Sequence, residues 1–100
     1  MYEYFTFLVP PVSCKPDQAG EFVLREDWKL KGKNIKKKRG ISLEDCKDFC
    51  LGFDGCASFD YDPKKKKCYL QRVKSSDKGV KMVRKEKKIY GEKCPGMYIL

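Results

Sequence analysis

Six cysteines are the residues whose types and spacing most directly suggest chemistry: Cys14, Cys46, Cys50, Cys56, Cys68 and Cys94. In a chain of 100 residues they favour either disulfide bonds in an oxidising compartment or thiolate ligands for zinc. With no histidine in the chain, a zinc site would need four thiolates, and the candidates are Cys46, Cys50, Cys56 and Cys68. Zinc ligands usually come in close pairs, and no second close pair follows Cys56, so the spacing favours disulfides. Spacing alone does not choose among the many possible pairings.

No group of residues in the sequence forms a recognisable catalytic site. The absence of histidine removes the commonest general base. Ser42 is better explained as a helix cap than as a nucleophile. Asp54, Asp60 and Asp62 lack the loop spacing and the closing glutamate of a calcium loop, and no glycine-rich phosphate loop is present. We therefore expect a protein without catalytic residues, metal site or cofactor.

The stretch from Ser42 to Gly52 predicts a short helix. Ser42 is a natural N-cap, and the two acids that follow Leu43 favour the positive end of the helix dipole. Apolar residues then recur at helical spacing: Leu43, Cys46, Phe49 and Cys50. Gly52 is expected to end the helix in a left-handed cap.

A β-hairpin should follow the helix. Residues 56–61 alternate apolar Ala57, Phe59 and Tyr61 with polar residues, as a half-buried strand does. Asp62-Pro63 is a turn signal, and residues 68–73 are expected to form the returning strand.

The flanking residues predict further extended segments. Residues 2–9, 21–24, 80–83 and 88–90 are candidate strands, and residues 28–31 and 35 place apolar side chains between lysines. Gly32 and Gly40 bracket a stretch that is expected to be rich in loops. The predicted fold is α+β, a twisted antiparallel sheet of about four or five strands with one helix packed across it. The expected core is Phe22, Leu24, Trp28, Ile35, Leu43, Phe49, Phe59, Tyr61, Leu70 and Val83.

These elements together resemble the PAN/apple module. The resemblance lies in a short helix with Cys46 and Cys50, a third cysteine at Cys56, an aromatic strand, and Cys68 followed by Leu70. It spans residues 14–94 and implies that residues 1–100 are one domain that binds ligands outside the cell. It also implies a nested set of disulfides: Cys14–Cys94, Cys46–Cys68 and Cys50–Cys56. No run approaches the roughly 20 apolar residues of a membrane span, and residues 1–12 lack the basic start of a signal peptide.

Charge is the remaining clue to function. The formal net charge is +9, and the helix region 42–62 is acidic whereas three other stretches are basic. The candidate anion-binding residues in these basic stretches are Lys36, Lys37, Lys38 and Arg39, then Lys64, Lys65, Lys66 and Lys67, then Arg84, Lys85, Lys87 and Lys88. A run of charge is often only a solvated surface, but three runs of one sign favour a polyanionic partner.

A sulfated glycan is the polyanion that these residues favour. Lysine dominates the clusters and no aromatic residue interrupts 36–39 or 64–67, which argues against a nucleic acid. The basic hairpin is also similar to that of a heparin-binding growth-factor domain in the PAN family. We therefore predict a secreted, non-catalytic module that binds heparin-like glycosaminoglycan. Two alternatives stay open, a protein-binding module and a lectin-like adhesin, and in both the surface lysines would be incidental. An acidic protein surface is the other candidate partner for the basic stretches.

Overall fold

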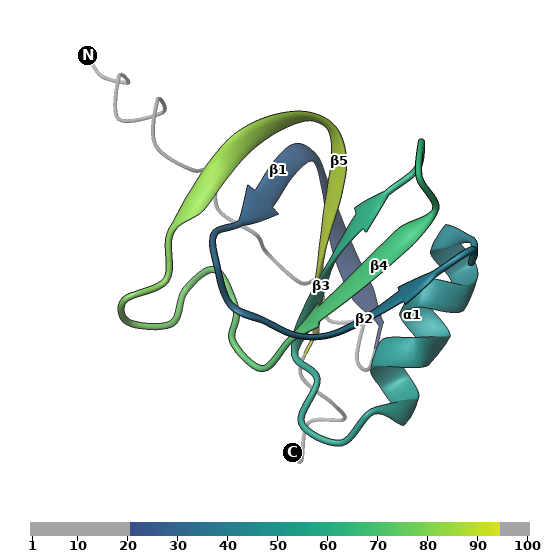
Figure 1. Cartoon of the computed structure of the whole chain (residues 1–100). Coiled ribbons are helices and arrows are strands. Elements are labelled where there is room, and N and C mark those ends of the chain that lie inside the picture. The colour runs from purple at the N-terminus through teal and green to yellow at the C-terminus, as the bar shows by residue number, and fades with distance from the viewer. Residues whose placement is uncertain (1–20, 95–100) are drawn as a thin grey trace.

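The computed structural model describes residues 21–94, which form an antiparallel five-stranded sheet and one helix (Figure 1). The elements are β1 (Phe22–Leu30), β2 (Asn34–Arg39), α1 (Leu43–Gly52), β3 (Ser58–Asp62), β4 (Lys67–Gln71) and β5 (Met82–Lys93). The predicted α+β fold is confirmed. The strand expected at residues 2–9 lies outside the described residues.

Helix α1 begins where the capping signal predicts. The backbone N–H of Asp45 donates to the Ser42 hydroxyl over 3.1 Å, which satisfies one of the unpaired N–H groups of the first turn. The expected left-handed cap at Gly52 is wrong, because Gly52 is the last helical residue and Phe53 continues in an extended conformation. The turn toward β3 uses Gly55 instead, whose φ of 84° is one that glycine adopts without strain.

The strand order is β1-β5-β3-β4-β2, so β3 lies in the middle and β2 forms one edge. The stretch between Gly32 and Gly40 is mostly this edge strand rather than loop. Residues 80–90 were predicted as two strands, but β5 is one long strand with an irregularity opposite Asp27: Glu26 pairs with Ile89, and Trp28 pairs with Arg84. The extra residues on β5 bend the β1–β5 ribbon, which arches over one face of the sheet in Figure 1.

The sheet has two different faces because side chains alternate along each strand. Helix α1 covers one of them, which we call the helix face. Phe59 and Leu70 are cross-strand partners there and are fully buried beside the Cys46–Cys68 disulfide. Gly91 is the partner of Phe59 on β5, and a Cβ at Gly91 would lie 2.3 Å from the Phe59 ring. The ring therefore packs directly on the backbone of β5.

The other face, which we call the polar face, is buried without being apolar. Ser58, Asp60 and Gln71 are each at most 4% exposed. The end of β1 folds over them, so that the Leu30 N–H donates to the Asp60 carboxylate over 3.1 Å. The Gln71 amide donates to the same carboxylate over 2.7 Å, and Ser58 donates to Gln71 over 2.8 Å. These mutual hydrogen bonds offset the cost of burying the polar groups.

The core prediction is partly right. Phe59, Tyr61 and Leu70 are buried, and Phe22, Trp28, Leu43, Phe49 and Val83 are partly buried. Two residues were placed in the core wrongly, since Leu24 is 37% exposed and Ile35 is 38% exposed. Ile35 lies on the edge strand β2 at a register irregularity, and every residue of that strand is exposed. Leu30 and Tyr90, which the prediction omitted, are fully buried.

Two disulfides connect α1 to the segments that follow it. Cys46 is bonded to Cys68 in β4, and Cys50 to Cys56 in the segment before β3, the pairs that the family resemblance implies. Because these four thiols are in disulfides, the zinc alternative is overturned. The third implied pair joins Cys94 to Cys14, and Cys14 lies outside the described residues, so that pair stays a prediction.

Candidate anion-binding surface

The edge strand and the hairpin turn bring two of the three basic clusters together. Lys36–Arg39 belong to β2, and Lys64–Lys67 span the β3–β4 turn and the first residue of β4. Arg39 is the direct cross-strand partner of Lys67. The Gly40 N–H also donates to the Lys66 carbonyl over 2.8 Å, so the end of β2 is fixed against the turn. Arg39 and Lys67, which are 28 positions apart in sequence, thus lie side by side.

Strand alternation divides the β2 cluster between the two faces. Lys37 and Arg39 share the polar face with their partners Tyr69 and Lys67. Lys36 and Lys38 lie on the helix side, and the Lys38 ammonium is 5.2 Å from the centroid of the Phe49 ring. The four cations therefore lie along one edge of the sheet, with two on each face.

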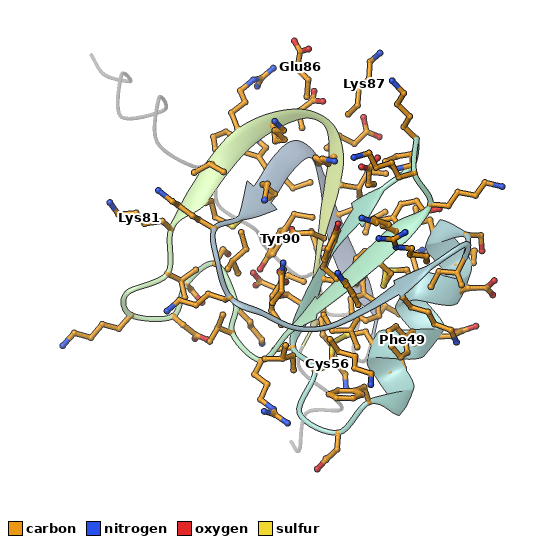
Figure 2. All side chains as sticks on the ribbon, in the orientation of Figure 1. Phe49, Cys56, Lys81, Glu86, Lys87 and Tyr90 are labelled. Carbon is orange, nitrogen blue, oxygen red and sulfur yellow. A yellow bond between two sulfur atoms is a disulfide. The ribbon has the colours of Figure 1, made fainter. Side chains whose placement is uncertain are left out.

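The third cluster lies at the bend of β5, and acids compensate part of its charge. The Lys88 ammonium contacts the Asp62 carboxylate, and Arg84 lies 3.9 Å from a carboxylate oxygen of Asp27. The Lys87 N–H donates to Asp27 over 2.9 Å, which ties the bend of β5 to β1. Figure 2 shows the side chains of Glu86 and Lys87 pointing away from the sheet at this bend. Lys85 and Lys87 make no ion pair with any residue of the described range 21–94.

Two open grooves follow the basic residues. One, the hairpin groove, has a volume of about 350 Å³ and lies between the β3–β4 turn and the β5 bend; it is lined by Glu26, Asp27, Pro63, Lys64, Lys87, Lys88 and Ile89. The other, the β2 groove, has a volume of about 340 Å³ and is lined by Asn34, Ile35, Lys36, Lys37 and Tyr69. We call the cations of β2, the turn and the β5 bend the basic rim: Lys36–Arg39, Lys64–Lys67, Lys87 and Lys88. Arg84 and Lys85 continue along β5 and line neither groove.

The pKa values of the two acids under this surface, Asp60 and Asp62, are shifted in opposite directions. Burial raises the pKa of Asp60 to about 6, although hydrogen bonds from Leu30 and Gln71 and the charges of Lys29 and Lys88 oppose the shift. The hydrogen bond from Lys88 lowers the pKa of Asp62, with further help from the N–H groups of Lys65 and Lys64. At neutral pH Asp62 is therefore a fixed anion paired with Lys88, whereas Asp60 titrates near pH 6.

Sequence reasoning missed this polar network. Asp60 was predicted only as a polar strand residue, Asp62 only as the start of a turn, and both were rejected as calcium ligands; Tyr90 was predicted only as part of a strand. In the structure the Tyr90 hydroxyl donates to Glu92 over 2.8 Å and accepts from the Ser75 N–H over 2.9 Å. Burial, followed by the hydrogen bond to Glu92, raises the pKa of Tyr90. Figure 2 shows Tyr90 in the interior of the molecule. The alternation of polar and apolar residues in β3 was the available signal, but it does not say which face another element covers.

Within residues 21–94 no group of histidine, cysteine, aspartate or glutamate side chains is arranged to hold a metal ion. No helix in that same range is long and apolar enough to cross a membrane.

Comparison with known families gives one match. The family model described as "PAN domain" matches residues 14–94. A search of curated proteins found no match. The matched region contains all six cysteines, the helix, the sheet and the basic rim.

Proposed function

Because the chain belongs to the PAN-domain family, we propose that it acts as a secreted module that binds sulfated glycosaminoglycans of the heparin type through the basic rim. PAN domains mediate binding to proteins or carbohydrates and are generally not catalytic. Those with disulfides typically occur in extracellular proteins, where sulfated glycans are abundant polyanions.

The observation that carries the proposal is the meeting of separate lysine clusters at one end of the sheet. Arg39 and Lys67 are paired across β2 and β4, and Lys64 lines one groove with Lys87 and Lys88. Charges that lie close together add their potentials, and each sulfate they bind releases condensed cations into solution. A single exposed ion pair is worth only about 0–1 kcal/mol, so clustering is what makes the attraction strong.

The grooves also suit the shape of a glycan chain. In the hairpin groove, Pro63 and Ile89 offer apolar surface to sugar C–H groups, and three lysines surround them with ammonium groups. Lysine is a flexible point charge, so it can reach sulfates without the fixed geometry that arginine needs. Glu26 and Asp27 line the opposite side of this groove and favour a path nearer the turn.

Heparin chromatography across ionic strength tests the proposal. We expect the triple variant Lys64→Gln, Lys65→Gln, Lys66→Gln to elute at clearly lower salt than the parent, and to show a shallower dependence of log affinity on log salt. The matched control Lys74→Gln, Lys78→Gln, Lys81→Gln removes the same charge from the connection between β4 and β5, and should elute close to the parent. Reversing Asp48 on α1 should not weaken binding. Equal loss in the two triple variants would mean that net charge alone drives retention.

A competing explanation exists for β2. Lysines on an edge strand prevent its unpaired backbone groups from pairing with other chains. If replacing Lys36–Arg39 with glutamine leaves heparin affinity unchanged and promotes aggregation, the β2 lysines protect the edge. Heparin would then be bound by the turn and the β5 bend without β2. If neither this variant nor the triple variant of the turn loses heparin affinity, the function would be binding to an acidic protein surface or another non-sulfated partner.

A further inference from the structure

A small pocket lies between the two grooves. It has a volume of about 170 Å³ and is lined by Lys29, Asn34, Asp60, Tyr61, Asp62, Tyr69 and Lys88. We call it the central pocket. It shares Asn34 and Tyr69 with the β2 groove and Lys88 with the hairpin groove. A chain that follows both grooves would therefore pass over the central pocket.

The acceptor groups of the pocket already have partners. Asp60 accepts hydrogen bonds from the Leu30 N–H and the Gln71 amide. Asp62 accepts from Lys88 and from the N–H groups of Lys64 and Lys65 at 3.0 and 3.2 Å. Both carboxylates are thus satisfied from within the fold.

The donor groups of the pocket are less fully used. In the described part of the chain, no hydrogen bond or ion pair involves the Lys29 ammonium, which acts on Asp60 only at longer range. Asn34 accepts from Gln71 through its oxygen at 3.1 Å, which leaves its two amide protons unused between residues 21 and 94. The Lys88 ammonium donates one of its three protons to Asp62 in a hydrogen bond. The unused hydrogen-bonding capacity is that of donors, and it suits an anionic oxygen group.

Below about pH 6, where Asp60 is protonated, the charge balance of the pocket favours the same ligand chemistry. Lys88 and Asp62 compensate each other, and the charge of Asp60 is balanced through Lys29. When Asp60 is protonated, Lys29 is left without a counter-charge within the pocket. An incoming sulfate or carboxylate would supply that counter-charge and would accept the hydrogen bonds that Lys29 and Asn34 can donate.

The size of the pocket limits the ligand to one ring. A cavity of about 150 Å³ holds a molecule of benzene, so the central pocket has room for about one six-membered ring. Tyr69 contributes an aromatic side chain to the wall, and the Lys67 ammonium lies 5.9 Å from the centroid of its ring. A cation on one side of this ring adds positive potential at the pocket's edge.

We propose that the central pocket is an anchoring subsite for one pyranose ring that bears a sulfate or a carboxylate, with the anionic group held by Lys29 and Asn34. This inference rests on the proposed function, because it names the part of the glycan that the surface recognises specifically. The basic rim attracts the chain by charge, and the central pocket selects one substituted sugar within it.

Titration of the disulfide-intact protein with single sugars tests the pocket directly. The probes are glucose 6-sulfate, glucuronate and glucose, and the readout is NMR chemical-shift change at Lys29, Asn34 and Tyr69. We expect saturable changes with one or both anionic sugars and none with glucose at the same concentration. The two anionic probes show whether sulfate or carboxylate is preferred. Equal changes with glucose, or changes with none of the three sugars, would overturn the inference.

Matched variants separate the pocket from general electrostatics. Lys29→Met should weaken binding of the preferred anionic sugar by about tenfold or more, the loss expected for a hydrogen bond to a charged group. Lys33→Met removes an equal charge from an exposed neighbour outside the pocket and should change binding less than about twofold. Asn34→Asp keeps the oxygen that accepts from Gln71 but replaces the free donor with an acceptor, so it should also weaken binding by about tenfold or more. Equal effects of Lys29→Met and Lys33→Met would refute the subsite.

Heparin chromatography distinguishes this inference from the proposed function. If full-length heparin binds with a steep salt dependence but single sugars do not, the basic rim functions without the pocket. If single anionic sugars bind and heparin is not retained, the pocket stands and the glycosaminoglycan proposal fails.

Discussion

The two faces of the sheet are stabilised by different means. On the helix face, Phe59 and Leu70 are buried together, and a disulfide joins Cys46 to Cys68 beside them. On the polar face, Ser58, Asp60 and Gln71 are equally buried but are held by a hydrogen-bond network. Apolar burial is favourable and tolerates imperfect geometry, whereas polar burial is neutral at best and depends on every partner.

The pocket that we propose as a sugar subsite lies on the face whose burial is more costly. All five residues of β3 are buried, so the central strand serves both layers. On the helix face, the buried apolar side chains and the disulfide stabilise the fold. The polar face leaves a pocket whose walls are lysine, asparagine, tyrosine and aspartate, and a surface of that kind can recognise a polar ligand.

The largest expected effect comes from breaking the helix face. Phe59→Ala should destabilise the protein by roughly 3–5 kcal/mol, because it leaves a cavity beneath the helix. The measurement is the free energy of unfolding in urea. Lys65→Ala, at the exposed turn, is the control and should change stability by about 0.5 kcal/mol or less. Equal denaturation midpoints for Phe59→Ala and the parent would show that this face does not carry the stability.

Removing the long disulfide should cost almost as much. Replacing both Cys46 and Cys68 with alanine should lower stability by about 2–5 kcal/mol, since the bond restricts a long loop of the unfolded chain. The Cys50–Cys56 bond spans only 6 residues against 22 for Cys46–Cys68, so its removal should cost about 1 kcal/mol less on loop entropy alone. Peptide mapping without reduction checks the pairing first. A Cys46–Cys56 link would contradict it.

Gly91→Ala should destabilise the protein by about 1–3 kcal/mol, because the added methyl group would overlap the Phe59 ring. In the background Phe59→Leu the same substitution should cost clearly less, since the ring is gone. This double-mutant cycle measures the contact between β5 and β3 directly. Additive effects would mean that Gly91 is required for its backbone conformation rather than for space.

A pH dependence of the free energy of unfolding is expected from the polar face. The pKa of Asp60 is raised to about 6 in the folded protein, above its usual value of 3.8, so the folded state binds this proton more tightly than the unfolded state. The contribution of Asp60 to stability therefore falls as the pH rises from about 4 to about 6. Asp62 has the opposite sign: its lowered pKa gives stability that is present above about pH 4 and lost in more acid solution.

Asp60→Asn should remove the part of the pH dependence that belongs to Asp60. Unfolding free energies at pH 4.5 and pH 7 should differ less in the variant than in the parent. Asp48→Asn, which changes an exposed acid on α1, is the control and should keep the slope of the parent. An unchanged slope in Asp60→Asn would mean that Asp60 is not the group that titrates.

Local sequence determined the elements that depend on neighbouring residues. Ser42 and the apolar spacing after it predicted α1, and alternation around Phe59 predicted β3. These signals are reliable because an N-cap and a period of 2 or 3.6 act within one turn or one strand. The lysine clusters were visible in the same way, as was the cysteine pattern of the PAN domain.

Only the tertiary structure decided which residues meet. The order β1-β5-β3-β4-β2 joins the first and last strands, and no local signal predicts that pairing. It leaves Ile35 exposed on the edge strand β2 and brings Leu30 over Asp60, 30 residues away in sequence. The same packing sets Lys29, Asn34 and Lys88 around one pocket. The physical reason is that burial and charge proximity depend on long-range strand pairing, whereas sequence patterns record only the preferences of each segment.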